Sequence, residues 1–125
     1  MMNLFSWLRN MFRGSHTPEI TPSNVADLVL AVERETGVNL TSSSSNASVA
    51  MRRAMVNVIL DRTGWTATEM ATDLRESGIT GHGWSRRSLS WYKTTAEWIT
   101  SNEPGGSAEF SRQYSMVSVI VNSNL

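Results

Sequence analysis

The stretch that decides the fold is residues 47–100, which read ASVAMRRAMVNVILDRTGWTATEMATDLRESGITGHGWSRRSLSWYKTTAEWIT. Its first third, residues 47–62, is apolar on most sides, as expected of the central helix of a small bundle. Gly64 then ends this helix, because glycine readily takes the left-handed conformation that closes a helix. The rest of the stretch carries the signals of two further helices with a loop between them.

The first of these two helices starts at a capping box. Thr66 and Glu69 have the spacing at which a hydroxyl and a carboxylate each accept a hydrogen bond from a backbone N–H at a helix start. This pattern predicts a short helix over 67–77. Residues 78–84 contain three glycines and therefore form a loop.

A helix over about 86–100 follows, with Ser85 as a typical N-cap residue. Trp84, Trp91 and Trp98 recur every seven residues, which is a helical spacing, and we expect them in the core or in a dimer contact rather than stacked on bases. The opposite face of this helix is polar, and it carries Arg86, Arg87, Ser90, Lys93, Thr94 and Glu97.

Two elements flank the central stretch. Thr21 and Pro22 suit the N-cap and first position of a helix over 22–36. After a turn at 102–106, β-branched residues alternate over 113–121, which predicts a strand within a β element at 107–121. Three pairing partners for this strand remain open: residues 107–111 across a hairpin, Val38–Leu40, and a second copy of the chain.

Residues 1–13 form a separate amphipathic segment with helical periodicity, followed by a linker at 14–21 that contains Gly14 and Pro18. Three interpretations remain open: the segment lies in a membrane interface, it docks on its own domain or on a protein partner, or it is a disordered tail. The residues expected to make that contact are Leu4, Phe5, Trp7, Leu8, Met11 and Phe12.

The composition argues against several kinds of chemistry. The chain has no cysteine, which removes disulfides and thiolate metal sites, and its two histidines, His16 and His82, are far apart in sequence. His82 lies between two glycines with no second catalytic group linked to it, and no phosphate-loop or dinucleotide motif occurs. We therefore expect a non-enzymatic, cytoplasmic protein without a metal or cofactor, associated with a membrane only if residues 1–13 bind one.

The charge pattern leaves binding as the expected activity. The net charge is zero, so any contact with nucleic acid must come from a local patch. The start of the helix at 86 supplies such a patch, because two guanidinium groups lie beside free amide donors and the positive end of the helix dipole. We expect Arg86, Arg87, Lys93 and Arg62 to contact phosphates, and Ser90 and Thr94 to contact base edges.

The run Ser88-Leu-Ser-Trp-Tyr-Lys93 resembles a pattern in small bacterial and phage proteins of the helix-turn-helix kind. The resemblance covers about 50 of the 125 residues. It implies a DNA-binding helix in which Trp91 and Tyr92 form the inner anchor, and Arg86, Arg87 and Lys93 the outer face.

The sequence thus predicts a mainly α fold: a small helical bundle over 22–125, with a helix-turn-helix-like unit at 47–100 and a short C-terminal strand or hairpin. The expected function is duplex DNA binding by a small regulatory or accessory protein of phage or bacterial type, with a homodimer as one assembly. The alternative is a membrane- or partner-docked adaptor or virion component that acts through residues 1–13.

Overall fold

The computed structural model describes residues 19–125, with the side chain of His82 excepted. The described residues are mainly helical and contain no strand. The expected helix at 1–13 lies outside them. The elements in order are α2 (Val25–Thr36), α3 (Asn46–Thr63), α4 (Ala67–Glu76), the short 3-10 helix η1 (His82–Trp84), α5 (Arg86–Asn102) and α6 (Pro104–Asn124).

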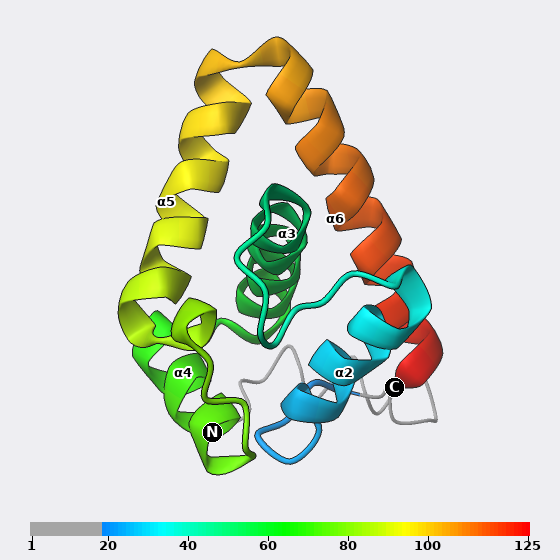
Figure 1. Cartoon of the computed structure of the whole chain (residues 1–125), viewed down its shortest axis with the longest axis vertical. Coiled ribbons are helices and arrows are strands. Elements are labelled where there is room, and N and C mark those ends of the chain that lie inside the picture. Colours follow the sequence, from blue (N-terminus) through cyan, green and yellow to red (C-terminus); the bar gives the residue numbers. More distant parts are fainter. Residues whose placement is uncertain (1–18) are drawn as a thin grey trace, which may run out of the picture.

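The last two helices of the chain, α5 and α6, form a helical hairpin. α5 and α6 meet at a tight turn and diverge away from it, and α3 lies between them (Figure 1). α4 packs against α5, and α2 packs against α6, at the open end of the hairpin. This arrangement leaves the outer surface of α5 uncovered along much of its length.

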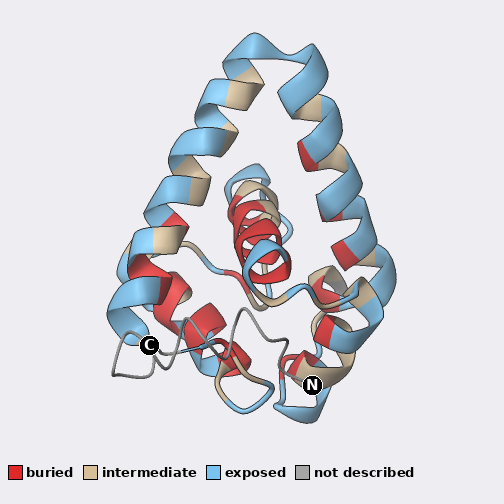
Figure 2. Cartoon of the chain, turned by 180° about the vertical axis from the view of Figure 1, so that it is seen from behind, coloured by how far each residue is buried: buried red, intermediate tan, exposed pale blue. Residues whose placement is uncertain are grey.

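α3 is the central helix of the bundle, as its apolar sequence predicts. Most of its residues between Met51 and Leu60 are buried, and it is the most continuously buried helix in the fold (Figure 2). Its N-cap Ser45 accepts a hydrogen bond from the Ser48 amide, and Gly64 closes it with a φ of 72°. A side chain at Gly64 would be strained in this left-handed conformation.

The capping signals at Thr66, Ser85 and Gly64 are confirmed, whereas the predicted N-cap at Thr21 is wrong. The Thr66 hydroxyl accepts from the Glu69 amide at 3.1 Å, and the Glu69 carboxylate accepts from the Thr66 amide at 3.1 Å. α2 begins at Val25 rather than at residue 22, because the preceding residues form a turn in which the Thr21 amide donates to the Asn24 side chain. α5 continues two residues past the expected end at residue 100.

The predicted C-terminal β element at 107–121 is wrong, because these residues belong to the 21-residue helix α6. Pro104 occupies the start of that helix, where its missing N–H is no loss. Val117, Ile120 and Val121 are buried at the i, i+3, i+4 spacing of a helix. The β-branched residues therefore fit a helix because α2 and α3 offer it an apolar surface, and this packing overrides their local preference for strands.

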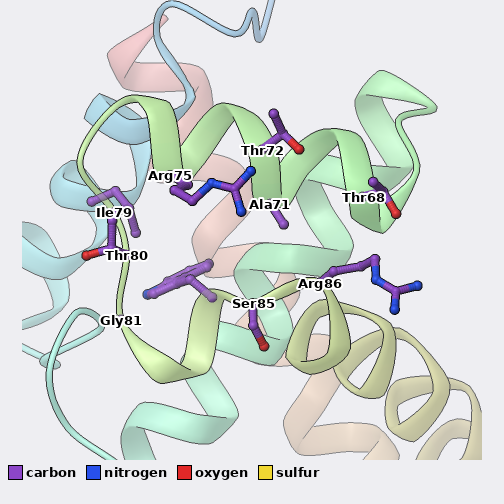
Figure 3. Close-up of a pocket in the computed structure, with 10 residues that line it drawn as sticks. Thr68, Ala71, Thr72, Arg75, Ile79, Thr80, Gly81, Ser85 and Arg86 are labelled. Carbon is purple, nitrogen blue, oxygen red and sulfur yellow. The ribbon is translucent and has the colours of Figure 1, made fainter.

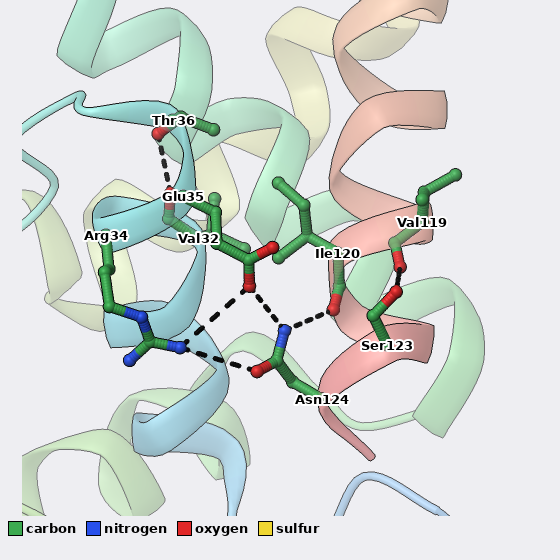
Figure 4. A network of polar contacts seen from close by, with 8 residues as sticks. All are labelled: Val32, Arg34, Glu35, Thr36, Val119, Ile120, Ser123 and Asn124. Carbon is green, nitrogen blue, oxygen red and sulfur yellow. Dashed lines mark hydrogen bonds and ion pairs between the residues drawn. The ribbon is translucent and has the colours of Figure 1, made fainter.

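A polar network ties the ends of α2 and α6 together (Figure 4). The Asn124 side-chain amide donates to Glu35 Oε2 at 2.7 Å, and Arg34 Nη2 donates to Asn124 Oδ1 at 3.5 Å. Arg34 and Glu35 also form an ion pair at 3.9 Å. These groups are exposed, so they fix the orientation of α6 more than they stabilise the fold.

A second contact joins α6 to α3. The Tyr114 hydroxyl donates to Asp61 Oδ2 at 2.8 Å. Burial and this hydrogen bond to a carboxylate raise the pKa of Tyr114 to about 12. The phenol therefore stays neutral at physiological pH and continues to donate to Asp61.

Candidate nucleic-acid interface

The placement of α5 depends on a buried polar cluster at the centre of the fold. Arg52, on α3, is only 4 % exposed. Its Nε donates to the Tyr92 hydroxyl at 2.8 Å, and its Nη1 donates to the carbonyls of Leu40 and Ser43 at 3.2 and 2.6 Å. Trp84 Nε1 donates to the same Leu40 carbonyl at 2.7 Å. The cluster thus joins α3, α5, η1 and the loop after α2.

The loop before α5 is held against this cluster at two glycines. A Cβ atom on Gly81 would lie 2.6 Å from the Thr41 carbonyl oxygen, and one on Gly83 would lie 2.5 Å from Arg52 Nε. Both distances are too short for a real contact, so only glycine permits this approach. The sequence predicts that both glycines lie in a loop. Their packing against the buried cluster is visible only in the structure.

α5 starts directly after this fixed loop and presents the predicted polar face to solvent. Ser85 caps the helix by accepting from the Ser88 amide at 3.2 Å. Leu89, Tyr92 and Ala96 form the buried inner face. The expected DNA-contacting residues of α5 are all exposed, namely Arg86, Arg87, Ser90, Lys93 and Thr94.

The three cations on this face are electrostatically unsatisfied within residues 19–125. Arg86, Arg87 and Lys93 form no hydrogen bond or ion pair with another described residue. The first turn of α5 also carries no acidic side chain. Arg86 and Arg87 lie at the positive end of the helix dipole, and Lys93 lies two turns further along, so this surface favours anions.

A cleft of about 490 Å³ lies between α4 and the start of α5 (Figure 3). Arg75 on α4 and Arg86 on α5 both line it, together with the hydroxyls of Thr68, Thr72 and Ser85. The two guanidinium groups and the hydroxyls of Thr68 and Thr72 are donors suited to phosphate oxygens, whereas the Ser85 hydroxyl donates to Ser88 Oγ at 3.1 Å. Arg75 was missed from the sequence, although its position seven residues after Thr68 places both on one face of the capped helix.

The acidic residues of α4 do not line this cleft. Glu69, Asp73 and Glu76 form a stripe roughly 100° around the helix from the face that carries Thr68 and Arg75, at about 100° per residue. Burial, together with repulsion from Glu76 and Glu69, raises the pKa of Asp73. The cleft is therefore lined by cations and neutral groups, as an anion site requires.

Thr94 and Arg62 differ from the rest of the predicted set. The Thr94 hydroxyl donates to the Ser90 carbonyl at 3.0 Å, which leaves its oxygen to act as an acceptor only. Arg62 lies in the last turn of α3, and its Nη1 donates to Asn122 Oδ1 of α6 at 2.5 Å. Arg62 is thus tied to α6 rather than to the polar face of α5.

The expectation that Trp91 forms an inner anchor is wrong. Trp91 is 51 % exposed and Trp98 is 55 % exposed, whereas Trp84 is 2 % exposed and belongs to the core. The seven-residue spacing places Trp91 and Trp98 on one side of α5, but α3 and α6 pack on another side. Tyr92 is buried as expected.

No family model, curated protein or solved structure matches the chain. Among the described residues, no group of three or more His, Cys, Asp or Glu side chains could hold a metal ion. No helix in the same part of the chain has the length and hydropathy to cross a membrane. The predicted contact residues Leu4, Phe5, Trp7, Leu8, Met11 and Phe12 lie outside the description.

Proposed function

We propose that this chain binds duplex DNA through the outer face of α5 and the adjoining α4–α5 cleft, as a small regulatory or accessory protein. The observation that carries this proposal is the set of three exposed, unpaired cations in the first turns of α5, with Arg75 across the cleft. In this proposal α4 and α5 act as the two helices of a helix-turn-helix-like unit.

The division of roles follows from the side-chain chemistry. The major groove is about 12 Å wide and admits an α-helix. With α5 in the groove, Arg86 and Arg75 contact phosphates of the same strand region, and the amides at the helix start add further donors. Ser90 and Thr94 lie on the outward side of α5, where Ser and Thr oxygens reach base edges.

The buried cluster supports this role by holding the binding helix in place before DNA arrives. Arg52 and Trp84 both bond to Leu40, and Gly83 packs on Arg52, so the loop that starts α5 is fixed. A binding surface that is already ordered loses little entropy on association.

Replacing Arg86 and Arg87 by alanine tests the proposal. We expect Arg86→Ala with Arg87→Ala to weaken duplex DNA binding by about 2 kcal/mol or more, which is roughly thirtyfold. Stability to urea should change by no more than about 0.5 kcal/mol, because both side chains are exposed and make no described contact. Fluorescence anisotropy with a labelled duplex measures the affinity.

The matched control removes two positive charges from other helices. Arg34→Ala with Arg112→Ala changes the net charge by the same amount at exposed positions on α2 and α6. This variant should bind DNA nearly as well as the wild type. An equal loss in both double variants would mean that binding depends on overall charge and not on the α5 face.

A further inference from the structure

Two tryptophans form an uncovered line on the outer side of α5. Trp91 and Trp98 are both about half exposed, and seven residues at 1.5 Å per residue separate them by about 10.5 Å along the helix. With Thr95 and Asn102 they repeat at intervals of four, three and four residues, the spacing of a coiled-coil seam. We name these four residues the α5 seam. Tryptophan is the residue most enriched at the energetic centres of protein interfaces.

Two polar side chains of the α5 seam already bond within the helix. The Thr95 hydroxyl donates to the Trp91 carbonyl at 2.8 Å, and the Asn102 side-chain amide donates to the Trp98 carbonyl at 2.9 Å. Removing water from these two donors therefore leaves neither of them without a hydrogen-bond acceptor. These two donors thus add little polar cost when the seam is covered.

The helix dipole of α5 favours acidic side chains at its start and basic side chains at its end, and the charges of α5 have the opposite order. Arg86 and Arg87 lie at the positive end, no basic residue occupies the last turn, and Glu103 is the C-cap. A second α5 packed antiparallel reverses this mismatch, because it brings the arginines of one copy to the C-terminal end of the other. The same helix thus carries both halves of a complementary charge pattern.

We propose that the α5 seam pairs with the α5 seam of a second copy of this chain, antiparallel and about a two-fold axis between Thr94 and Thr95. In this register Trp91 packs against Trp98 of the second copy, twice by symmetry. Arg87 reaches the last turn of α5 of the second copy, where a cation is favoured by the free carbonyls.

The pairing leaves Arg86 on an open side of α5 but covers Arg87 and Thr94. These two residues lie only about 20–60° around the helix from Trp91 and Trp98, so the second copy and DNA compete for them. At 100° per residue, Arg86 lies roughly 120–140° around α5 from Trp91 and Trp98. The dimer forms without DNA, so its failure and the failure of DNA binding are separate results.

Sedimentation equilibrium of the full-length chain over a wide concentration range tests the pairing. The wild type should reach twice the mass of the 13.9 kDa chain. Trp91→Ser with Trp98→Ser should remain monomeric with an unchanged circular dichroism spectrum. The control Met116→Ser with Val119→Ser removes exposed apolar side chains from α6 and should still dimerise.

Cysteine cross-linking tests the register, because the chain contains no cysteine of its own. Thr95→Cys lies next to the two-fold axis and should form a disulfide-linked dimer on mild oxidation. Asn102→Cys lies far from its own copy in an antiparallel pair and should not. A parallel pair would cross-link at both positions.

Three results would overturn the pairing. The first is a wild-type monomer at every concentration, and the second is a dimer that persists without both tryptophans. The third is cross-linking at residue 102 as efficient as at residue 95. A monomer in which Leu4→Ser with Leu8→Ser, on a Trp7→Phe background, increases iodide quenching of the remaining tryptophans would assign the seam to residues 1–13 instead.

Discussion

Trp84→Ala is expected to lower the free energy of unfolding by about 3–5 kcal/mol, the range for deleting a large buried aromatic side chain. Trp84 is 2 % exposed, and its indole N–H donates to the Leu40 carbonyl at 2.7 Å. Removing it opens a cavity beside α5 and takes away one of the two donors that hold Leu40. Urea unfolding followed by circular dichroism measures the change.

Trp91→Ala is the matched control for this substitution. Half of the Trp91 side chain is exposed, so its loss should change the stability of the monomer by about 1 kcal/mol or less. Both variants should be compared at concentrations low enough to keep the chain monomeric, since pairing through Trp91 would add to the wild-type stability. Equal costs for Trp84 and Trp91 would contradict the assignment of one to the core and the other to the surface.

Arg52→Ala is expected to cost about 3–4 kcal/mol of unfolding free energy. Arg52 donates to three oxygen acceptors, one on α5 and two in the loop after α2, and an unsatisfied buried acceptor costs about 1–3 kcal/mol. The loss is moderated at Leu40, whose carbonyl keeps its bond from Trp84. Arg52→Lys should recover little, because one ammonium cannot reproduce the planar fork of donors.

The neighbouring arginine provides the control. Arg53 is partly buried, its Nε is buried without a hydrogen-bond partner, and burial lowers its pKa. Arg53→Ala should therefore change stability by about 1 kcal/mol or less, since it removes a poorly satisfied group. A larger cost for Arg53 than for Arg52 would mean that the buried cluster does not hold the fold together.

Most helix boundaries before residue 103 follow from local chemistry, which explains why the sequence predicts them, although the start of α2 and the end of α5 differ by three and two residues. Ser85, Thr66, Gly37 and Gly64 act through residues three or four positions away, so their effect is visible without the rest of the chain. α6 is different, because its alternating β-branched residues fit a strand or a helix equally. Only the apolar surface of α2 and α3 decides between them.

The candidate site likewise contains features that the sequence predicts and features that depend on tertiary packing. The outer polar face of α5 follows from helical periodicity and is exposed as expected. Trp91 was misplaced, because periodicity groups residues on one side without telling which side packs on the core. The place of Arg75 in the cleft depends on how α4 packs against α5. The role of Arg52 depends on its contact with Tyr92, 40 residues away in the sequence. Both are tertiary properties that local patterns do not show.

The measurement that tests the central claim most directly is the affinity of the full-length chain for duplex DNA as a function of salt concentration. Each neutralised phosphate releases counterions, so three to four phosphate contacts should give a slope of roughly −3 to −4 in a plot of log K against log salt. The Arg86→Ala, Arg87→Ala variant should show a slope shallower by about 2. An affinity that does not change with salt, or no binding at low salt, would contradict DNA binding through the face of α5.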